Sequence, residues 1–316
     1  MAQENKKIGA EINFQKEQES FEKAKEKYRK AIRALKPLSV LDDLPAPPIK
    51  RAAYSDRMAL IMANMAKLAY IKFEESELGL EELDYSLRSG WMNLIATFNK
   101  NGTQAFLAKN DEFSVLAFRG TETDKWEDIR TDLRFIKEKT IDGKVHVGFL
   151  EAFNDVKGEI FDTMRENMGK DVPLYITGHS LGAALATVAT GELDKEFDNW
   201  IAACYTFGSP RVGDGKFEKS IKTPFYRIVN TTDIVSLVPF FLGTFVHVGD
   251  ERYLSRKRVD GVNVLFRGVP MLRRTIESLI ETLIASFRLN PFTPWIGAHA
   301  IDEYIDKLER YAHARN

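Results

Sequence analysis

The stretch V-P-L-Y-I-T-G-H-S-L-G-A-A-L-A-T-V-A-T, residues 172–190, decides the fold. Its first part, Val172 to Thr177, reads as a buried strand, and its last part is composed of residues that suit a helix. The pentapeptide G-x-S-x-G lies between them, centred on Ser180. A strand, a tight turn and a helix in this order predict a nucleophile elbow, which exposes the serine at the end of the sheet. Ser180 is therefore the predicted nucleophile, and the alternative is a tight glycine turn around a buried serine.

The two glycines of the pentapeptide have a steric role in this prediction. A sharp turn at the serine leaves no room for a Cβ beside it, so Gly178 and Gly182 are expected where the backbone segments come close. The backbone N–H of Leu181 is expected at the N-terminus of the following helix. An N–H in that position can donate to an oxyanion. Leu181 is thus a predicted oxyanion-hole residue.

A nucleophilic serine requires a base, and an elbow of this type places the histidine after the serine in the chain. Three histidines follow Ser180: His247, His299 and His313. His247 lies in a strand-like stretch, and His313 lies in the charged tail. His299 lies between a loop with a glycine and a final amphipathic helix, which makes it the favoured base, with His247 as the alternative.

The acid that orients the base is expected between the serine and the histidine. The apolar run F-Y-R-I-V-N, Phe225 to Asn230, predicts a buried strand, and Asp233 follows its end. Functional groups of α/β sheets gather at the carboxyl ends of strands, so Asp233 is the predicted acid. A turn-capping aspartate is the alternative interpretation of Asp233. The main competitor is Asp214, in the turn-rich stretch P-R-V-G-D-G.

Six stretches resemble, in order and spacing, the class 3 lipases, a family of α/β-hydrolases. They are L-A-F-R-G-T-E-T-D-K-W-E-D-I-R-T-D-L (116–133), V-H-V-G-F-L-E-A-F (145–153), I-T-G-H-S-L-G-A-A-L-A (176–186), Y-T-F-G-S-P-R-V-G-D (205–214), V-N-T-T-D-I-V (229–235) and G-A-H-A-I-D-E-Y (297–304). The resemblance implies an α/β-hydrolase fold with a central, mostly parallel sheet. It also implies Ser180, Asp233 and His299 as a catalytic triad and Thr121 as the second oxyanion-hole residue. The two histidines at 146 and 247 are implied to be structural.

The resemblance further implies a serine hydrolase that cleaves carboxylic esters through an acyl-enzyme. A lipase acting on acylglycerols is the first expectation, and a phospholipase A1 or a short-chain carboxylesterase is the alternative. A hypothesis of another class is a membrane-surface scaffold with a relict triad. No cofactor is expected. Scattered histidines and the lack of an H-E-x-x-H sequence also predict no metal site.

Composition is that of a globular enzyme rather than a nucleic-acid-binding protein. The chain has 316 residues, with 45 Lys and Arg against 46 Asp and Glu, so no basic field favours a nucleic-acid partner. Cys204 is the single cysteine, which excludes a disulfide within the chain. The first ten residues lack the apolar core of a signal peptide, and no run is apolar enough to span a membrane. A cytoplasmic location is expected, with secretion left open if the start is a processed one.

Two domains are predicted, divided by a proline-rich linker. Residues 1–48 read as one amphipathic helix followed by L-D-D-L-P-A-P-P, and residues 49–316 read as the hydrolase domain. The first helix is expected to pack on the hydrolase body, with dimerisation or membrane contact as alternatives. A second helix, Asp56 to Phe73, carries a methionine stripe that is interpreted as core.

Two segments leave their roles open. Residues 122–133 are short and highly charged, so they form either a lid or a plain surface helix. The insertion before His299 is read as helical, with a basic stretch from Arg252 to Arg274 ahead of an amphipathic helix, Leu272 to Phe287. This segment, 252–295, is expected either to cap an acyl pocket or to make a peripheral contact with an anionic membrane. The oligomeric state is not predicted.

Overall fold

The structure of the chain is a computed structural model. It describes residues 53–120, 137–140, 142–169, 172–197, 200–231, 233, 235–237, 245–259, 262–267 and 298–314. Four features of the sequence analysis lie outside these residues: the helix in 1–48, Thr121, the candidate lid 122–133 and the helix at 272–287.

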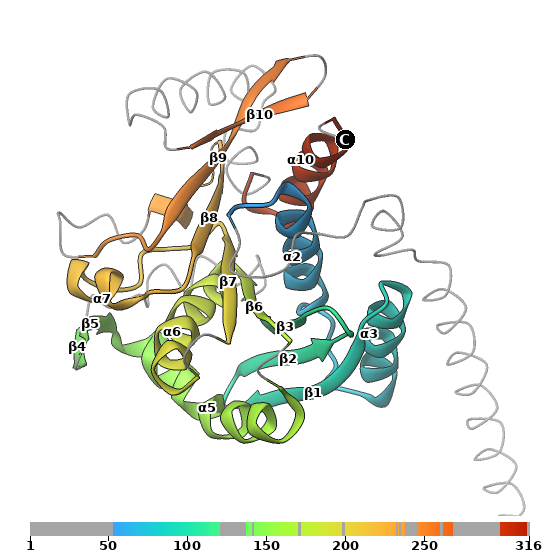
Figure 1. Ribbon diagram of the computed structural model, residues 1–316, viewed down its shortest axis with the longest axis vertical. Coiled ribbons are helices and arrows are strands. Elements are labelled where there is room, and N and C mark those ends of the chain that lie inside the picture. Colours follow the sequence, from blue (N-terminus) through green and yellow to red (C-terminus); the bar gives the residue numbers. More distant parts are fainter. Residues whose placement is uncertain are drawn as a thin grey trace, which may run out of the picture.

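An eight-stranded sheet forms the centre of the protein, in the order β1-β2-β3-β6-β7-β8-β9-β10 (Figure 1). Neighbouring strands from β3 to β9 are parallel, and the pairs β1–β2, β2–β3 and β9–β10 are antiparallel. A short hairpin of β4 and β5 stands apart from this sheet. The strands are β1 (Asn93–Lys100), β2 (Thr103–Lys109), β3 (Ser114–Phe118), β4 (Lys137–Thr140), β5 (Gly143–His146), β6 (Leu174–His179), β7 (Ile201–Phe207), β8 (Phe225–Asn230), β9 (Asp250–Val259) and β10 (Val262–Arg267).

Helices cover both faces of the sheet. On one face α2 and α10 lie side by side, and on the other α5 lies beside α6 (Figure 1). The helices are α2 (Asp56–Leu68), α3 (Glu77–Ser89), α5 (Val147–Asn167), α6 (Leu181–Glu196), α7 (Gly215–Ser220) and α10 (Ile301–Ala314), with the 3₁₀ turn η3 (Val235–Leu237). None of the helices within the described ranges is both long and apolar enough to cross a membrane.

Two hydrophobic cores follow from this layering. The first lies under α2 and α10, and the second lies under α5 and α6. Met58, Met62 and Met65 of α2 are buried in the first core, which confirms that the methionine stripe is core. Burial of each such side chain contributes roughly 1.5–3 kcal/mol. Ser55 caps α2 by accepting a hydrogen bond from the Met58 N–H. The helix ends at Leu68, five residues before the predicted end.

The insertion before His299 begins as strands. The basic residues that follow Arg252 read as a loop in the sequence, but the backbone from Asp250 to Val259 forms β9, and Val262 to Arg267 forms β10. β9 joins the sheet because it pairs in parallel with β8, and β10 is the last strand at that edge. Basic residues thus extend the central sheet, and the described part of the insertion is a β-hairpin rather than a loop, while the helix predicted at 272–287 lies outside the described residues.

Candidate active site

The serine elbow lies at the end of β6. Ser180 follows the strand and is the N-cap of α6, with φ 58° and ψ −127°. A positive φ in a non-glycine residue is strained, and its cost of roughly 1–3 kcal/mol persists only where the surroundings enforce it. The Ser180 N–H donates to the Phe207 carbonyl at the end of β7, at 3.0 Å, which fixes the turn.

The glycines beside Ser180 are required by space. A Cβ on Gly178 would come within 2.8 Å of the Ala183 nitrogen, and a Cβ on Gly182 would come within 2.7 Å of the Arg119 carbonyl carbon. These neighbours are backbone atoms, so they cannot move aside like a flexible side chain. The steric role predicted for both glycines is confirmed.

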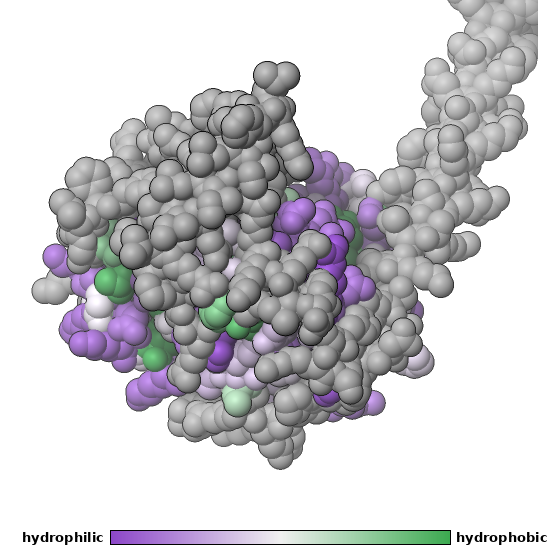
Figure 2. Space-filling model, turned by 90° about the horizontal axis from the view of Figure 1, so that it is seen from above, coloured by the Kyte–Doolittle hydropathy of each residue, from purple (hydrophilic) through white to green (hydrophobic). Residues whose placement is uncertain are grey.

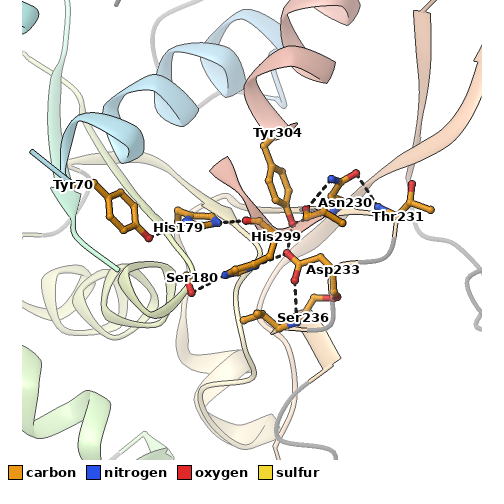
Figure 3. Close-up of polar contacts among 11 residues, drawn as sticks. Tyr70, His179, Ser180, Asn230, Thr231, Asp233, Ser236, His299 and Tyr304 are labelled. Atoms are coloured by element: carbon orange, nitrogen blue, oxygen red, sulfur yellow. Dashed lines mark hydrogen bonds and ion pairs between the residues drawn. The ribbon is translucent and has the colours of Figure 1, made fainter. Parts of the chain in front are cut away.

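The structure brings Ser180, His299 and Asp233 into one hydrogen-bonded row (Figure 3). His299 Nε2 lies 2.8 Å from the Ser180 Oγ, and His299 Nδ1 lies 2.9 Å from Asp233 Oδ2. An ionised carboxylate only accepts, so Nδ1 carries the proton and Nε2 is left to accept from the serine hydroxyl. This is the tautomer that a general base toward Ser180 needs.

Asp233 is held as a carboxylate in a buried position. Burial raises its pKa, but hydrogen bonds from His299 and Tyr304 together with the nearby His299 charge outweigh burial, so the pKa lies below its ordinary value. The Tyr304 hydroxyl donates to Oδ2 at 2.5 Å, and the Val235 N–H donates to Oδ1 at 2.9 Å. The acid therefore has a fixed orientation and keeps its charge opposite the imidazole.

Gly208, at the end of β7, makes room for this pair. Its φ is +58°, and a Cβ there would lie 2.5 Å from Asp233 Oδ2 and 2.9 Å from the His299 ring. Any side chain at this position would push the acid and the base apart. The glycine sits in the quoted stretch Y-T-F-G-S-P, but its role was not visible in the sequence because the contact joins residues from three distant segments.

The competing residues of the sequence analysis have other roles. Asp214 caps α7 by accepting hydrogen bonds from two backbone N–H groups, Lys216 and Phe217. The buried His146 stacks on Phe149 with ring centroids 4.6 Å apart. His247 follows Val246, which bridges only to Gly213, so the strand-like stretch around it is not a strand of the sheet. His299 is the histidine that contacts Ser180.

The expected oxyanion site is described in part. Leu181 begins α6 directly after Ser180, so its N–H belongs to the first turn, whose N–H groups have no partner within the helix. The end of β3 lies beside the elbow as expected, since a Cβ on Gly120 would come within 3.2 Å of the Ser180 Cβ. Arg119 anchors this end by pairing with Glu74. Thr121 follows directly but lies outside the described residues, so its role stays a prediction.

Four further residues surround the row: Tyr70, His179, Asn230 and Tyr304 (Figure 3). Sequence reasoning assigned no role to any of them. Each makes a hydrogen bond to a residue far away in the sequence, as in the bond from Tyr304 to Asp233, which spans 71 residues. Three of the four, His179, Asn230 and Tyr304, lie within the stretches that resemble the class 3 lipases. Their place in those stretches was the one sequence signal that could have pointed to a role at the site.

Nothing in the described ranges suggests a metal site, because no three His, Cys, Asp or Glu side chains there gather to hold an ion. Cys204 is buried in β7, and burial raises the pKa of its thiol. It is an inert core residue, as expected from its apolar strand.

Comparison with known proteins agrees with this geometry. Residues 115–243 match the family described as "Lipase (class 3)". The chain is 31% identical to a lipase of Rhizomucor miehei over 225 residues, which cover 66% of this chain and 56% of that protein. It is also 31% identical over 175 residues to "Phospholipase A(1) DAD1, chloroplastic" of Arabidopsis thaliana, covering 48% of this chain and 39% of that protein.

Among solved structures, a lipase of Rhizopus microsporus var. chinensis superposes with a TM-score of 0.58 at 26% identity, covering 72% of this chain and 86% of that one. The chain spans about half the length of the curated relatives it matches. The serine elbow, the parallel sheet and these matches together show that residues 115–243 of the chain match the class 3 lipase family, on the fold of the fungal lipases.

Proposed function

We propose that this protein is a serine hydrolase of carboxylic esters, with Ser180 as nucleophile, His299 as base and Asp233 as the orienting acid. The single observation that carries the proposal is the continuous chain of hydrogen bonds through the three side chains, 2.8 Å and 2.9 Å long. The three come from separate segments of the chain, and a purely structural serine would not need a base in this tautomer.

The reaction follows from the proton positions. Ser180 Oγ attacks the ester carbonyl while His299 Nε2 takes the hydroxyl proton, and Asp233 stabilises the imidazolium that forms. The C–O bond to the alcohol breaks, and the imidazolium protonates the leaving alkoxide. In the second half of the reaction, His299 Nε2 takes a proton from water while the water oxygen attacks the acyl carbon. The bond to Ser180 Oγ then breaks and the imidazolium protonates this oxygen, which releases the acid and restores Ser180. In this proposal the N–H groups of Leu181 and Thr121 donate to the tetrahedral oxyanion.

The proposed substrates are acylglycerols. The relative from Rhizomucor miehei is named a lipase, which supports this class. A phospholipase A1 activity is the second candidate, and the relative from Arabidopsis thaliana named "Phospholipase A(1) DAD1, chloroplastic" favours it. Both activities would use the same three residues, so they differ only in the alcohol or head group that leaves.

A substrate panel separates these possibilities. The purified protein and its Ser180→Ala variant would be assayed with p-nitrophenyl butyrate, diolein, triolein and phosphatidylcholine, and released fatty acid measured. We expect the wild type to hydrolyse the glycerides at least tenfold faster than the phospholipid and the variant to be inactive on all of them. Faster release from phosphatidylcholine would favour the phospholipase. If a folded wild-type protein hydrolyses none of these substrates, the remaining hypothesis is a membrane-surface scaffold with a relict triad.

We also propose a peripheral contact with anionic membranes through the insertion. In its described part, the sequences of β9 and β10, at the edge of the sheet, contain five basic residues: Arg252, Arg256, Lys257, Arg258 and Arg267. On the face shown in Figure 2 the described residues are mainly hydrophilic, with small separate hydrophobic patches. Because β9 is rich in arginine and lysine, charge is expected to lead the contact. Each basic residue near an anionic surface contributes about 1 kcal/mol, which salt screens.

Arg252 is the one of these five residues that is not expected to contact the membrane. It already pairs with Asp250 and lies over the Tyr54 ring, so it contributes to folding rather than to an outer surface. Reversal of three of the other charges, as Arg256→Glu, Lys257→Glu and Arg258→Glu together, is expected to abolish sedimentation with phosphatidylserine vesicles at low salt and to spare hydrolysis of p-nitrophenyl butyrate. If the triple variant sediments like the parent, this stretch does not make the contact.

A further inference from the structure

His179, the residue before the nucleophile, has its ring turned toward the base rather than toward the serine. His179 Nε2 lies 2.6 Å from the carbonyl oxygen of His299, and Nδ1 lies 2.8 Å from the Tyr70 hydroxyl (Figure 3). The two histidine rings are 4.5 Å apart at a tilt of 32°. The His179 side chain is buried at 2% exposure, so no water competes for either nitrogen.

The partners fix the direction of this short chain of hydrogen bonds. A backbone carbonyl only accepts, so His179 Nε2 carries the proton and donates to His299. Nδ1 is then the acceptor, and the Tyr70 hydroxyl donates to it. Burial, with a smaller effect from the His299 charge, lowers the pKa of His179 to about 3, which keeps the ring neutral at the pH values where a hydrolase of this type would act.

A second side chain anchors the backbone next to His299, at Ala298. Asn230, at the end of β8, donates through Nδ2 to the carbonyl oxygen of Ala298 at 2.8 Å. The amide orientation is fixed, because a flip would break the hydrogen bonds that Oδ1 accepts from Lys307 Nζ and from the Thr231 N–H. Two consecutive carbonyls, 298 and 299, are therefore held by two different strands of the sheet.

We propose that His179 is a positioning residue that holds the backbone of His299 at a fixed place relative to the serine elbow. This inference rests on the proposed function. The nucleophile and the residue that positions its base are neighbours in the chain, so any shift of the elbow also moves the anchor of the base. The distance from His299 Nε2 to Ser180 Oγ is then set by β6, with Asn230 preventing rotation of the turn. A displacement of about 1 Å in such a site costs roughly 100-fold in rate.

Two amide substitutions test the inference as a matched pair. In His179→Gln the side-chain nitrogen can occupy the place of Nε2 and donate to the His299 carbonyl. In His179→Asn it reaches only the place of Nδ1. With p-nitrophenyl butyrate we expect the Gln variant to keep kcat within about threefold of wild type. The Asn variant is expected to lose roughly 10- to 100-fold in kcat, with KM nearly unchanged because the anchor does not touch substrate.

Equal kcat values for the two variants would overturn the inference, whether both are low or both are high. Should the Asn variant fail to fold, Tyr70→Phe provides a second arm, since it removes the donor to Nδ1 and leaves the ring in place. It is expected to lower kcat about three- to tenfold at constant KM, and an unchanged kcat would contradict the inference. Wild-type hydrolysis and labelling of Ser180 by a fluorophosphonate report separately on the proposed function: if these succeed and the variants behave alike, only the positioning role fails.

Discussion

Removal of the His179 ring should change how the stability of the protein depends on pH. In the folded protein His179 has a pKa of about 3 because it is buried, against an ordinary value of 6.5. As pH falls below about 6.5 the unfolded chain binds a proton that the folded protein refuses. The free energy of unfolding therefore decreases with falling pH, and this loss ends near pH 3.

The size of the effect follows from the shift. Each pKa unit corresponds to about 1.36 kcal/mol, so the two units between 6.5 and an experimental pH of about 4.5 give a destabilisation of roughly 2–3 kcal/mol relative to pH 8. His179→Gln has no ionisable group at this position, so its unfolding free energy lacks this term. The difference between variant and wild type should thus move by roughly 2–3 kcal/mol in favour of the variant from pH 8 to pH 4.5.

Urea denaturation at about pH 8, 6 and 4.5 would measure this difference, with all other ionisable groups common to both proteins. Gly158→Ala in α5 is a control, because it changes no titratable group and should shift stability equally at each pH. A difference between His179→Gln and wild type that stays constant from pH 8 to pH 4.5 would refute the reasoning. It would mean that His179 takes up a proton in the folded protein as readily as in the unfolded one.

Three substitutions test local contacts, two beside the site and one in α5. Gly182→Ala should lower stability by about 1–3 kcal/mol and reduce ester hydrolysis at least roughly 100-fold, since its Cβ would meet the backbone of β3 and Arg119; a variant with normal kcat would contradict this. Gly158→Ala should raise stability by roughly 0.5–1 kcal/mol in thermal or urea unfolding, because a Cβ there meets nothing within 4 Å and alanine favours the helix. Tyr304→Phe removes a hydrogen bond to the Asp233 carboxylate and should cost about 1.5–3 kcal/mol of stability and roughly tenfold in kcat; unchanged values in both assays would show that the hydroxyl does not orient Asp233.

The parts of the fold that were predictable are those with a local signal. The apolar run before Gly178 predicts β6, and the run ending at Asn230 predicts β8 to the residue. The predicted strand from Val172 to Thr177 differs from β6, which runs from Leu174 to His179. The strand continues through Gly178 and His179 because both pair in parallel with β7. A glycine in the sequence marks a turn, but the pairing decides where the strand ends.

The hairpin of β9 and β10 was not predictable for a related reason. β9 is dense in arginine and lysine and lacks an alternating apolar pattern, so the stretch reads as a loop, and the short apolar run of β10 does not offset this. Pairing of β9 with β8 makes them part of the sheet. β-propensity is weak where cross-strand contacts supply the stability.

Chain order limited the candidates for acid and base, and local context together with the family resemblance then favoured Asp233 and His299 over Asp214 and His247. It could not reveal the residues that hold them. The link from His179 to His299 spans 120 residues and that from Asn230 to Ala298 spans 68, and neither leaves a local pattern. Such positioning contacts depend on which strand ends meet at the sheet edge, and only the structure shows that.

The central claim is that Ser180 is the activated nucleophile of an ester hydrolase, and active-site labelling tests it most directly. The wild type and a folded Ser180→Ala variant would be treated with a fluorophosphonate, digested and analysed by peptide mass spectrometry. We expect one adduct in the wild type, on the peptide that contains Ser180, with loss of ester hydrolysis in proportion to labelling and no adduct in the variant. A wild type that stays unlabelled, or a Ser180→Ala variant that still hydrolyses ester at the wild-type rate, would contradict the account.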